Sequence, residues 1–153
     1  MNIKYKVHQS SIFGMDANIV SLLIYLLPVV ISFLSYGTSG GYLTWLIPGL
    51  VLIFEKESKL VKFHAWQALF MSLFYGFIGF IGTLFGAGFA FTSLLTQNAG
   101  GLLSSIGFLF VMGIIGLIFA ILEIIAAIKG FSWISYRLPI IGRWASNLAH
   151  ENE

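Results

Sequence analysis

Residues 65–122 read AWQALFMSLFYGFIGFIGTLFGAGFAFTSLLTQNAGGLLSSIGFLFVMGIIGLIFAIL, a run of 58 residues without a formal charge. A helix rises 1.5 Å per residue and needs about 20 residues to cross the roughly 30 Å hydrocarbon core of a bilayer. The run is therefore long enough for two crossings and a turn. Because polar residues interrupt it near its middle, it predicts a membrane hairpin with spans over 65–89 and 102–128, joined by a loop over 90–101.

Residues 17–54 form a second uncharged run, of 38 residues. It predicts another hairpin, with spans over 17–35 and 42–54 and a turn between them. The first stretch is too long for a signal peptide and no A-x-A site follows it, so we expect it to be retained. The second span has only about 13 residues, roughly 20 Å, and contains a proline. A re-entrant segment that does not cross is the alternative interpretation.

The composition excludes most other classes of protein. The chain is 58% hydrophobic and 9% charged, whereas soluble domains have about 25% charged residues. A mean hydropathy of +0.94 excludes disorder. There is no cysteine, and hence no disulfide or thiolate site. The predicted fold is all-α: a polytopic membrane protein with four transmembrane helices in two hairpins and an interfacial C-terminal segment.

The basic residues predict the orientation of these hairpins. All eight precede the first span, lie between the second and third, or follow the fourth, and the two opposite loops carry none. Under the positive-inside rule, both termini and the central loop face the cytoplasm. We therefore expect a multi-pass protein of the plasma membrane.

Five of the basic residues are candidates for contacts with lipid head groups. They lie in the central loop and in the tail: Lys56, Lys59, Lys62, Arg137 and Arg143. The expected partner is the anionic surface of the cytoplasmic leaflet. Nucleic acid is not expected, because the chain has no polar basic face. Aromatic residues beside the two arginines predict that residues 131–148 lie along the membrane surface, with a break at Pro139.

Glu123 is the acidic residue placed inside a predicted span. It shares a helical face with Gly116, Ala120 and Ala127, and small residues mark the face where another helix approaches. The carboxyl is therefore expected to point into the bundle, because a charge facing lipid costs about 2.5 kcal/mol or more.

A matching stripe of small residues lies on the third span, at Tyr75, Gly79, Gly82 and Gly86. If these two faces meet, Glu123 is expected to hydrogen-bond with Tyr75 or Ser72 and to reach Gln67 through water. Two interpretations of the carboxyl stay open: a proton or cation site, or a group that pins two helices together by hydrogen bonding.

His64 and Gln67 are three residues apart and share one face of the first turn of the third span. The structural interpretation is that they tie the preceding loop to the C-terminal tail. No metal site is expected, because the other histidines, His8 and His150, are far away in sequence. No nucleophile with a base, no phosphate-binding glycine loop and no cofactor motif is present, so we expect no catalytic residues and no cofactor.

Two motifs carry a family resemblance. Residues 54–69 read FEKESKLVKFHAWQAL, and after Gly130 residues 136–142 read YRLPIIG. Over residues 22–145 the chain resembles a bacterial and archaeal family of small four-span membrane proteins of unknown function. That family is similar to the twenty-kilodalton membrane subunit of the protein translocon of the chloroplast inner envelope. The resemblance implies a four-helix membrane bundle with both termini cytoplasmic.

Two functions of different kinds are compatible with these patterns. The leading hypothesis is a non-enzymatic integral membrane protein that serves as a subunit or scaffold of a membrane translocation assembly. Four helices pack without a wide pore, so transport of protein would require a homo-oligomer or other membrane subunits. The alternative is a small transporter of protons, cations or solutes that uses Glu123 in a cavity of the bundle.

Overall fold

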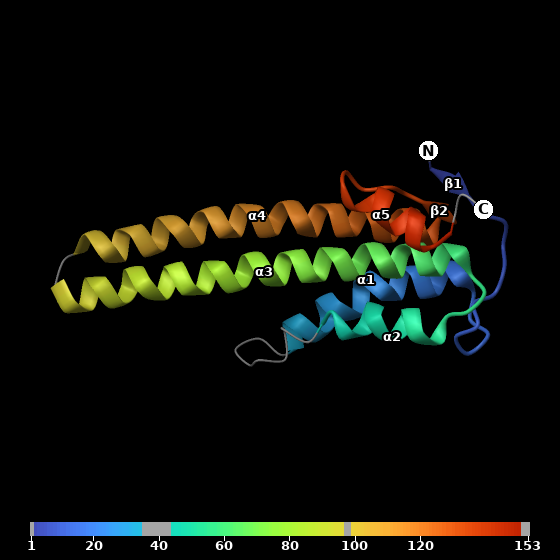
Figure 1. Ribbon diagram of the computed structural model, residues 1–153, viewed down its shortest axis with the longest axis horizontal. Coiled ribbons are helices and arrows are strands. Elements are labelled where there is room, and N and C mark those ends of the chain that lie inside the picture. Colours follow the sequence, from blue (N-terminus) through green and yellow to red (C-terminus); the bar gives the residue numbers. More distant parts are fainter. Residues whose placement is uncertain (1, 35–43, 97–98, 151–153) are drawn as a thin grey trace. The chain divides into compact units, whose positions relative to one another are not determined.

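The computed structural model describes residues 2–34, 44–96 and 99–150 (Figure 1). In chain order its elements are β1 (Ile3–Lys4), α1 (Ala17–Leu34), α2 (Leu46–Phe54), α3 (Lys59–Thr96), α4 (Ala99–Phe131), β2 (Ile134–Ser135) and α5 (Ile141–Leu148). The turn expected over 36–41 lies outside the described residues. The chain is mainly helical, as predicted.

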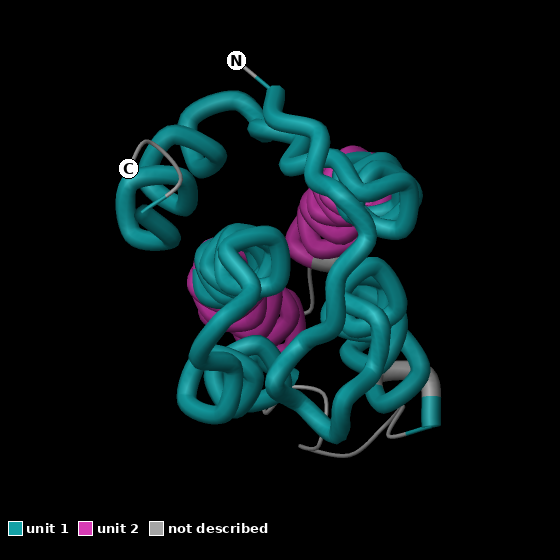
Figure 2. Tube along the Cα trace, turned by 90° about the vertical axis from the view of Figure 1, so that its right-hand side faces the viewer, with its two compact units in different colours: residues 1–73, 122–153 teal, residues 74–121 magenta. Residues whose placement is uncertain are grey.

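The chain divides into two compact units, coloured in Figure 2. The first unit comprises Met1–Leu73 and Leu122–Glu153, and the second comprises Phe74–Ile121. Every charged residue and every histidine of the sequence belongs to the first unit. The second unit consists of the uncharged parts of α3 and α4.

Within the second unit, α3 and α4 pack through aromatic rings and close glycine contacts. Phe74 stacks on Phe119, with ring centroids 5.7 Å apart. Phe108 lies 6.2 Å from the rings of both Phe85 and Phe89. The order of these contacts along the two helices is antiparallel, which is the arrangement of a helical hairpin.

The two predicted small-residue stripes face each other only in part. A Cβ atom at Gly116 would lie 3.3 Å from the hydroxyl oxygen of Tyr75, and one at Gly82 would lie 3.0 Å from Cε of Met112. At Gly79 and Gly86, a Cβ atom would have no neighbour within 4 Å. Tyr75 and Gly82 are therefore correctly predicted to face α4, and the other two glycines are not.

The loop expected over 90–101 is wrong, because α3 continues to Thr96 and α4 begins at Ala99. Side-chain hydroxyls explain why polar residues do not end the helix here. Thr92 donates to the carbonyl of Gly88 at 2.9 Å, and Thr96 donates to that of Thr92 at 2.8 Å. Because each hydroxyl is satisfied by the preceding turn of its own helix, these residues are compatible with an apolar environment. The expected span over 102–128 lies within α4.

The start of α3 lies six residues earlier than the expected span over 65–89, at Lys59. Ser58 caps this end, because its hydroxyl oxygen accepts a hydrogen bond from the backbone N–H of Val61 at 3.2 Å. Ring nitrogen Nε2 of His8 lies 2.7 Å from the same hydroxyl. The lysines beside Ser58 are good helix formers, so the helix begins at the cap rather than at the first apolar residue.

Helices α3 and α4 are long and apolar enough to cross a membrane. Many of their large apolar side chains are exposed, including Leu94 at 78% and Phe110 at 71%. The core helix of a soluble protein would bury such side chains. Length, composition and exposure together favour a membrane environment for these two helices.

Helices α1 and α2 pack against each other and are shorter. At 1.5 Å per residue, the 18 residues of α1 cover about 27 Å and the 9 residues of α2 about 14 Å. The expected span over 42–54 is therefore only partly helical. Pro48 lies in the first turn of α2, where its missing N–H costs little, and α1 continues through Pro28.

The two ends of the chain meet in a short antiparallel sheet, in which Ile3 pairs with Ser135 and Lys4 with Ile134. This sheet corrects the expectation of a purely α-helical fold. The tail expected along the membrane surface over 131–148 contains α5, which packs on α3. Phe63 forms a buried cluster with Ala145 and Ala149, and Trp66 packs against it.

Candidate functional site

A chain of hydrogen bonds joins α1, α3 and the tail within the first unit. The hydroxyl of Tyr25 on α1 lies 3.1 Å from Nδ1 of His64 and accepts a hydrogen bond of 3.2 Å from Nε2 of Gln67. Nε2 of His64 lies 3.1 Å from the carbonyl oxygen of Ile134. At the other end, the backbone N–H of Leu138 donates to Oε1 of Gln67 at 3.2 Å. All three side chains are buried.

The backbone groups at the two ends determine the direction of every bond in this chain. The carbonyl of Ile134 only accepts, so Nε2 of His64 carries the hydrogen and Nδ1 is the acceptor in the neutral ring. The hydroxyl of Tyr25 therefore donates to Nδ1 and accepts from Gln67. Every hydrogen bond in the series is therefore donated in the same direction, from the backbone N–H of Leu138 towards the carbonyl of Ile134.

The arrangement confirms that His64 and Gln67 hold the C-terminal tail. It also requires a small residue at the end of α4. A Cβ atom at Gly130 would lie 3.1 Å from Nε2 of His64 and 3.1 Å from Cβ of Ser21. Glycine at this position lets α4 approach α1 and α3 where the hydrogen-bonded chain meets the tail.

Glu123 is half-buried on α4, and its carboxyl interacts electrostatically with the hydroxyl of Tyr25. In the part of the chain that the structure describes, no hydrogen bond joins Glu123 to Ser72, so that expectation is wrong. Tyr75 belongs to the second unit, where its hydroxyl lies beside Gly116. A hydrogen bond between Tyr75 and Glu123 stays a prediction.

A second buried polar group, Glu55, lies between α2 and α3. Its carboxylate accepts hydrogen bonds from the hydroxyl of Ser10, from the hydroxyl of Ser11 at 2.8 Å, and from the backbone N–H groups of Glu57 and Ser58 at 3.0 and 2.9 Å. Burial alone would raise the pKa of Glu55, but these hydrogen bonds outweigh it and hold the pKa below its ordinary value of 4.5. The carboxylate thus joins the chain before α1 to the chain after α2.

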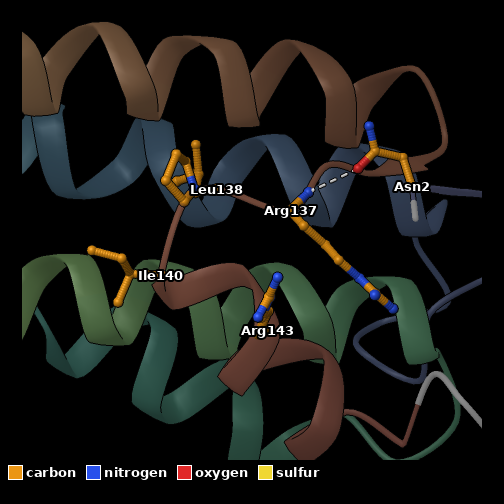
Figure 3. A pocket seen from close by; sticks show the side chains of 6 residues that line it. Asn2, Arg137, Leu138, Ile140 and Arg143 are labelled. Carbon is orange, nitrogen blue, oxygen red and sulfur yellow. Dashed lines mark hydrogen bonds between the residues drawn. The ribbon is translucent and has the colours of Figure 1, made fainter.

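The predicted head-group contacts fall into two sets. Lys56 and Lys59 are exposed, and Nζ of Lys62 donates to the carbonyl of Lys56 at 2.6 Å. In the tail, Arg137 and Arg143 line a pocket of about 480 Å³. Figure 3 shows both side chains in this pocket.

Neither a metal centre nor a catalytic arrangement is found among the described residues. No group of three or more His, Cys, Asp or Glu residues there is close enough to hold a metal ion. The bonds of His64 are directed at a tyrosine hydroxyl and a backbone carbonyl, which is not the arrangement of a base with a nucleophile. No protein-family model, curated protein or solved structure matches this chain.

Two buried residues of this site are not recognisable in the sequence. Tyr25 lies in an apolar run, where a single tyrosine carries no pattern of its own. Glu55 stands beside Lys56 and Glu57 and is therefore expected to be solvated. The one available signal was the helical spacing that puts Ser21 and Tyr25 on a common face of α1.

We predict that Tyr25→Phe destabilises the protein by about 2 to 6 kcal/mol. The substitution leaves Nδ1 of His64 and Nε2 of Gln67 without their partner, and each unsatisfied buried group costs about 1 to 3 kcal/mol. Unfolding by a denaturing detergent measures the difference. Tyr75→Phe is the matched control, because its side chain is 50% exposed. Equal losses in both variants would contradict a stabilising role for the chain of hydrogen bonds.

The Glu55 network predicts acid sensitivity. Because folding lowers the pKa of Glu55, its ionised form stabilises the fold above about pH 4.5, and this contribution is lost as the pH falls below that value. Glu55→Gln should flatten the loss of stability in this acidic range. The exposed neighbour provides a control, Glu57→Gln, which removes the same charge. If both variants keep the acid sensitivity of the original protein, the network is not its source.

Proposed function

We propose that this chain is a non-enzymatic subunit or scaffold of a membrane translocation assembly. The observation that carries the proposal is the separation of charge: the parts of α3 and α4 in the second unit are uncharged, and the first unit holds every charged residue. Each arm of the hairpin within the second unit covers about 35 Å, enough to cross a bilayer core of about 30 Å. The role in translocation rests on the family resemblance.

The orientation is supported by hydrogen bonds within the first unit. The three basic segments are the N-terminal segment, the link between α2 and α3, and the tail. Ser10 and Ser11 bond to Glu55 in the link, and β1 pairs with β2 in the tail. Segments that are bonded to one another lie on the same side of a membrane, and the positive-inside rule makes that side the cytoplasm. The proposed location is the plasma membrane.

For α1 and α2 the lengths favour the re-entrant arrangement over two complete spans. Beyond Tyr25, which is bonded to His64 and Gln67, α1 continues to Leu34 for only about 14 Å. Helix α2 also covers about 14 Å, roughly half of the bilayer core. We therefore propose that α1 and α2 enter and leave through the cytoplasmic face, and that α3 and α4 cross.

The transporter alternative has less support. The carboxyl of Glu123 interacts electrostatically with the hydroxyl of Tyr25, but the hydrogen-bonded network of Tyr25 ends on backbone groups in both directions. A tyrosine that gives its proton to His64 would have to be reprotonated by the amide of Gln67, which is not an acid. This series of hydrogen bonds therefore does not provide a path for proton release.

The topology is testable by labelling, because the sequence has no cysteine and each variant would carry a single thiol. We expect a membrane-impermeant maleimide to label Lys59→Cys and Arg143→Cys from the cytoplasmic face and Thr96→Cys from the opposite face. Leu34→Cys should resist labelling from both faces. Labelling of Leu34→Cys from the outer face would establish four complete spans, and labelling of Lys59→Cys and Arg143→Cys from opposite faces would contradict the proposed fold in the membrane.

The scaffold function is testable by extraction in a mild detergent. We expect a membrane partner or further copies to remain bound in stoichiometric amounts, and Gln67→Leu to release them by loosening the tail while the protein stays in the membrane. Tyr75→Phe should retain them. Recovery of a solitary chain would contradict the proposal. Proton or cation flux in reconstituted vesicles that is lost in Glu123→Gln would instead support the transporter.

A further inference from the structure

We propose that the pocket lined by Asn2, Arg137 and Arg143 binds the phosphate group of an anionic membrane lipid. The inference rests on the membrane placement proposed above and names the partner of its cytoplasmic side. The pocket has a volume of about 480 Å³ and is completed by Leu138, Pro139 and Ile140. This volume lies in the range of sites for small ligands.

The charge of the lining selects an anion. Two arginines and one asparagine line the pocket, and no acidic residue is among the described residues that line it. Guanidinium groups match the geometry of phosphate oxygens by paired hydrogen bonds. Arg137 is held by the rest of the tail, since its Nη2 donates to the hydroxyl of Ser146 and its backbone N–H donates to Oδ1 of Asn2 at 3.2 Å (Figure 3). The exposed side chain of Arg143 completes the site.

The backbone brings the two arginines together through an unusual turn. Ile140 has φ 68° and ψ −64°, and the N–H of Ile141 donates to the carbonyl of Pro139 at 2.8 Å. This is the rarer and more strained form of γ-turn. Strained backbone of this kind persists where the surrounding structure holds it, and such positions concentrate at binding sites.

Gly142 makes this turn compatible with Arg137. A Cβ atom at Gly142 would lie 2.6 Å from Cα of Arg137, so a larger residue does not fit. The first turn of α5 is thereby pressed against the backbone of Arg137, with Arg143 as the next residue along the helix. No side chain caps this end of α5, and its amide groups add positive potential near the pocket.

The apolar neighbours of the pocket identify the anion as a lipid. Ile140 is 74% exposed and lines the pocket together with the two arginines. Trp144 is 56% exposed and follows Arg143 in the sequence. Free phosphate has no apolar part that could contact such side chains, whereas a lipid has acyl chains beside its phosphate. An aromatic ring with neighbouring arginines is the pattern that favours the boundary between head groups and acyl chains.

The test counts the lipids that stay bound to the full-length protein in detergent, by native mass spectrometry. Phosphatidylglycerol and phosphatidylcholine with identical acyl chains are the probes. We expect about tenfold stronger retention of phosphatidylglycerol, and about a tenfold loss of that preference in Arg143→Gln. Arg143→Lys keeps the positive charge but lacks the planar guanidinium group, so it should lose part of the preference for phosphatidylglycerol. Lys6→Gln removes an exposed cation outside the pocket and should change nothing.

Three results would overturn the inference. An equal loss in Lys6→Gln and Arg143→Gln would mean that overall charge attracts the lipid. Displacement of the lipid by millimolar inorganic phosphate would identify free phosphate as the ligand. Reconstitution into a bilayer without any preference for phosphatidylglycerol would remove the pocket as a lipid site. Failure to reconstitute at all would instead contradict the membrane placement on which the inference rests.

Discussion

Backbone amides and carbonyls inside hydrocarbon have no water to bond, so a chain that enters a membrane must satisfy them by itself. The second unit obeys this constraint throughout its described length. It is helical and has no charged residue. Five of its Ser and Thr hydroxyls donate to the preceding turn of their own helix, as Thr83 does to the carbonyl of Gly79 at 2.9 Å. Its packing therefore depends on ring contacts and on close approach at small residues.

The first unit has the opposite character, because it concentrates buried polar groups that satisfy one another across long stretches of sequence. Tyr25, His64 and Gln67 join α1 and α3 to the tail, and Glu55 joins the N-terminal segment to the link before α3. Networks of this kind are costly when any member lacks its partner. They consequently favour a single arrangement of the segments that they connect.

The spacing of charges along the chain was sufficient to predict helices in the right places. It failed at the ends of the helices, because those depend on local hydrogen bonds: the cap at Ser58 and the bonded hydroxyls of Thr92 and Thr96. The sequence predicted only those members of the site that helical spacing puts on one face of a helix, which are His64 and Gln67. Tyr25 and Glu55 could not be found in this way, since their burial depends on partners 39 or more residues away.

The pairing of β1 with β2 has a consequence for biosynthesis. Ile3 and Lys4 are synthesised before α1 to α4, and their partners Ser135 and Ile134 are synthesised after them. The sheet therefore forms only after α1 to α4 have been made, and β1 waits unpaired in the nascent chain. Synthesis of β2 is thus the event that allows the two strands to join, and it separates formation of the helices from closure of the fold.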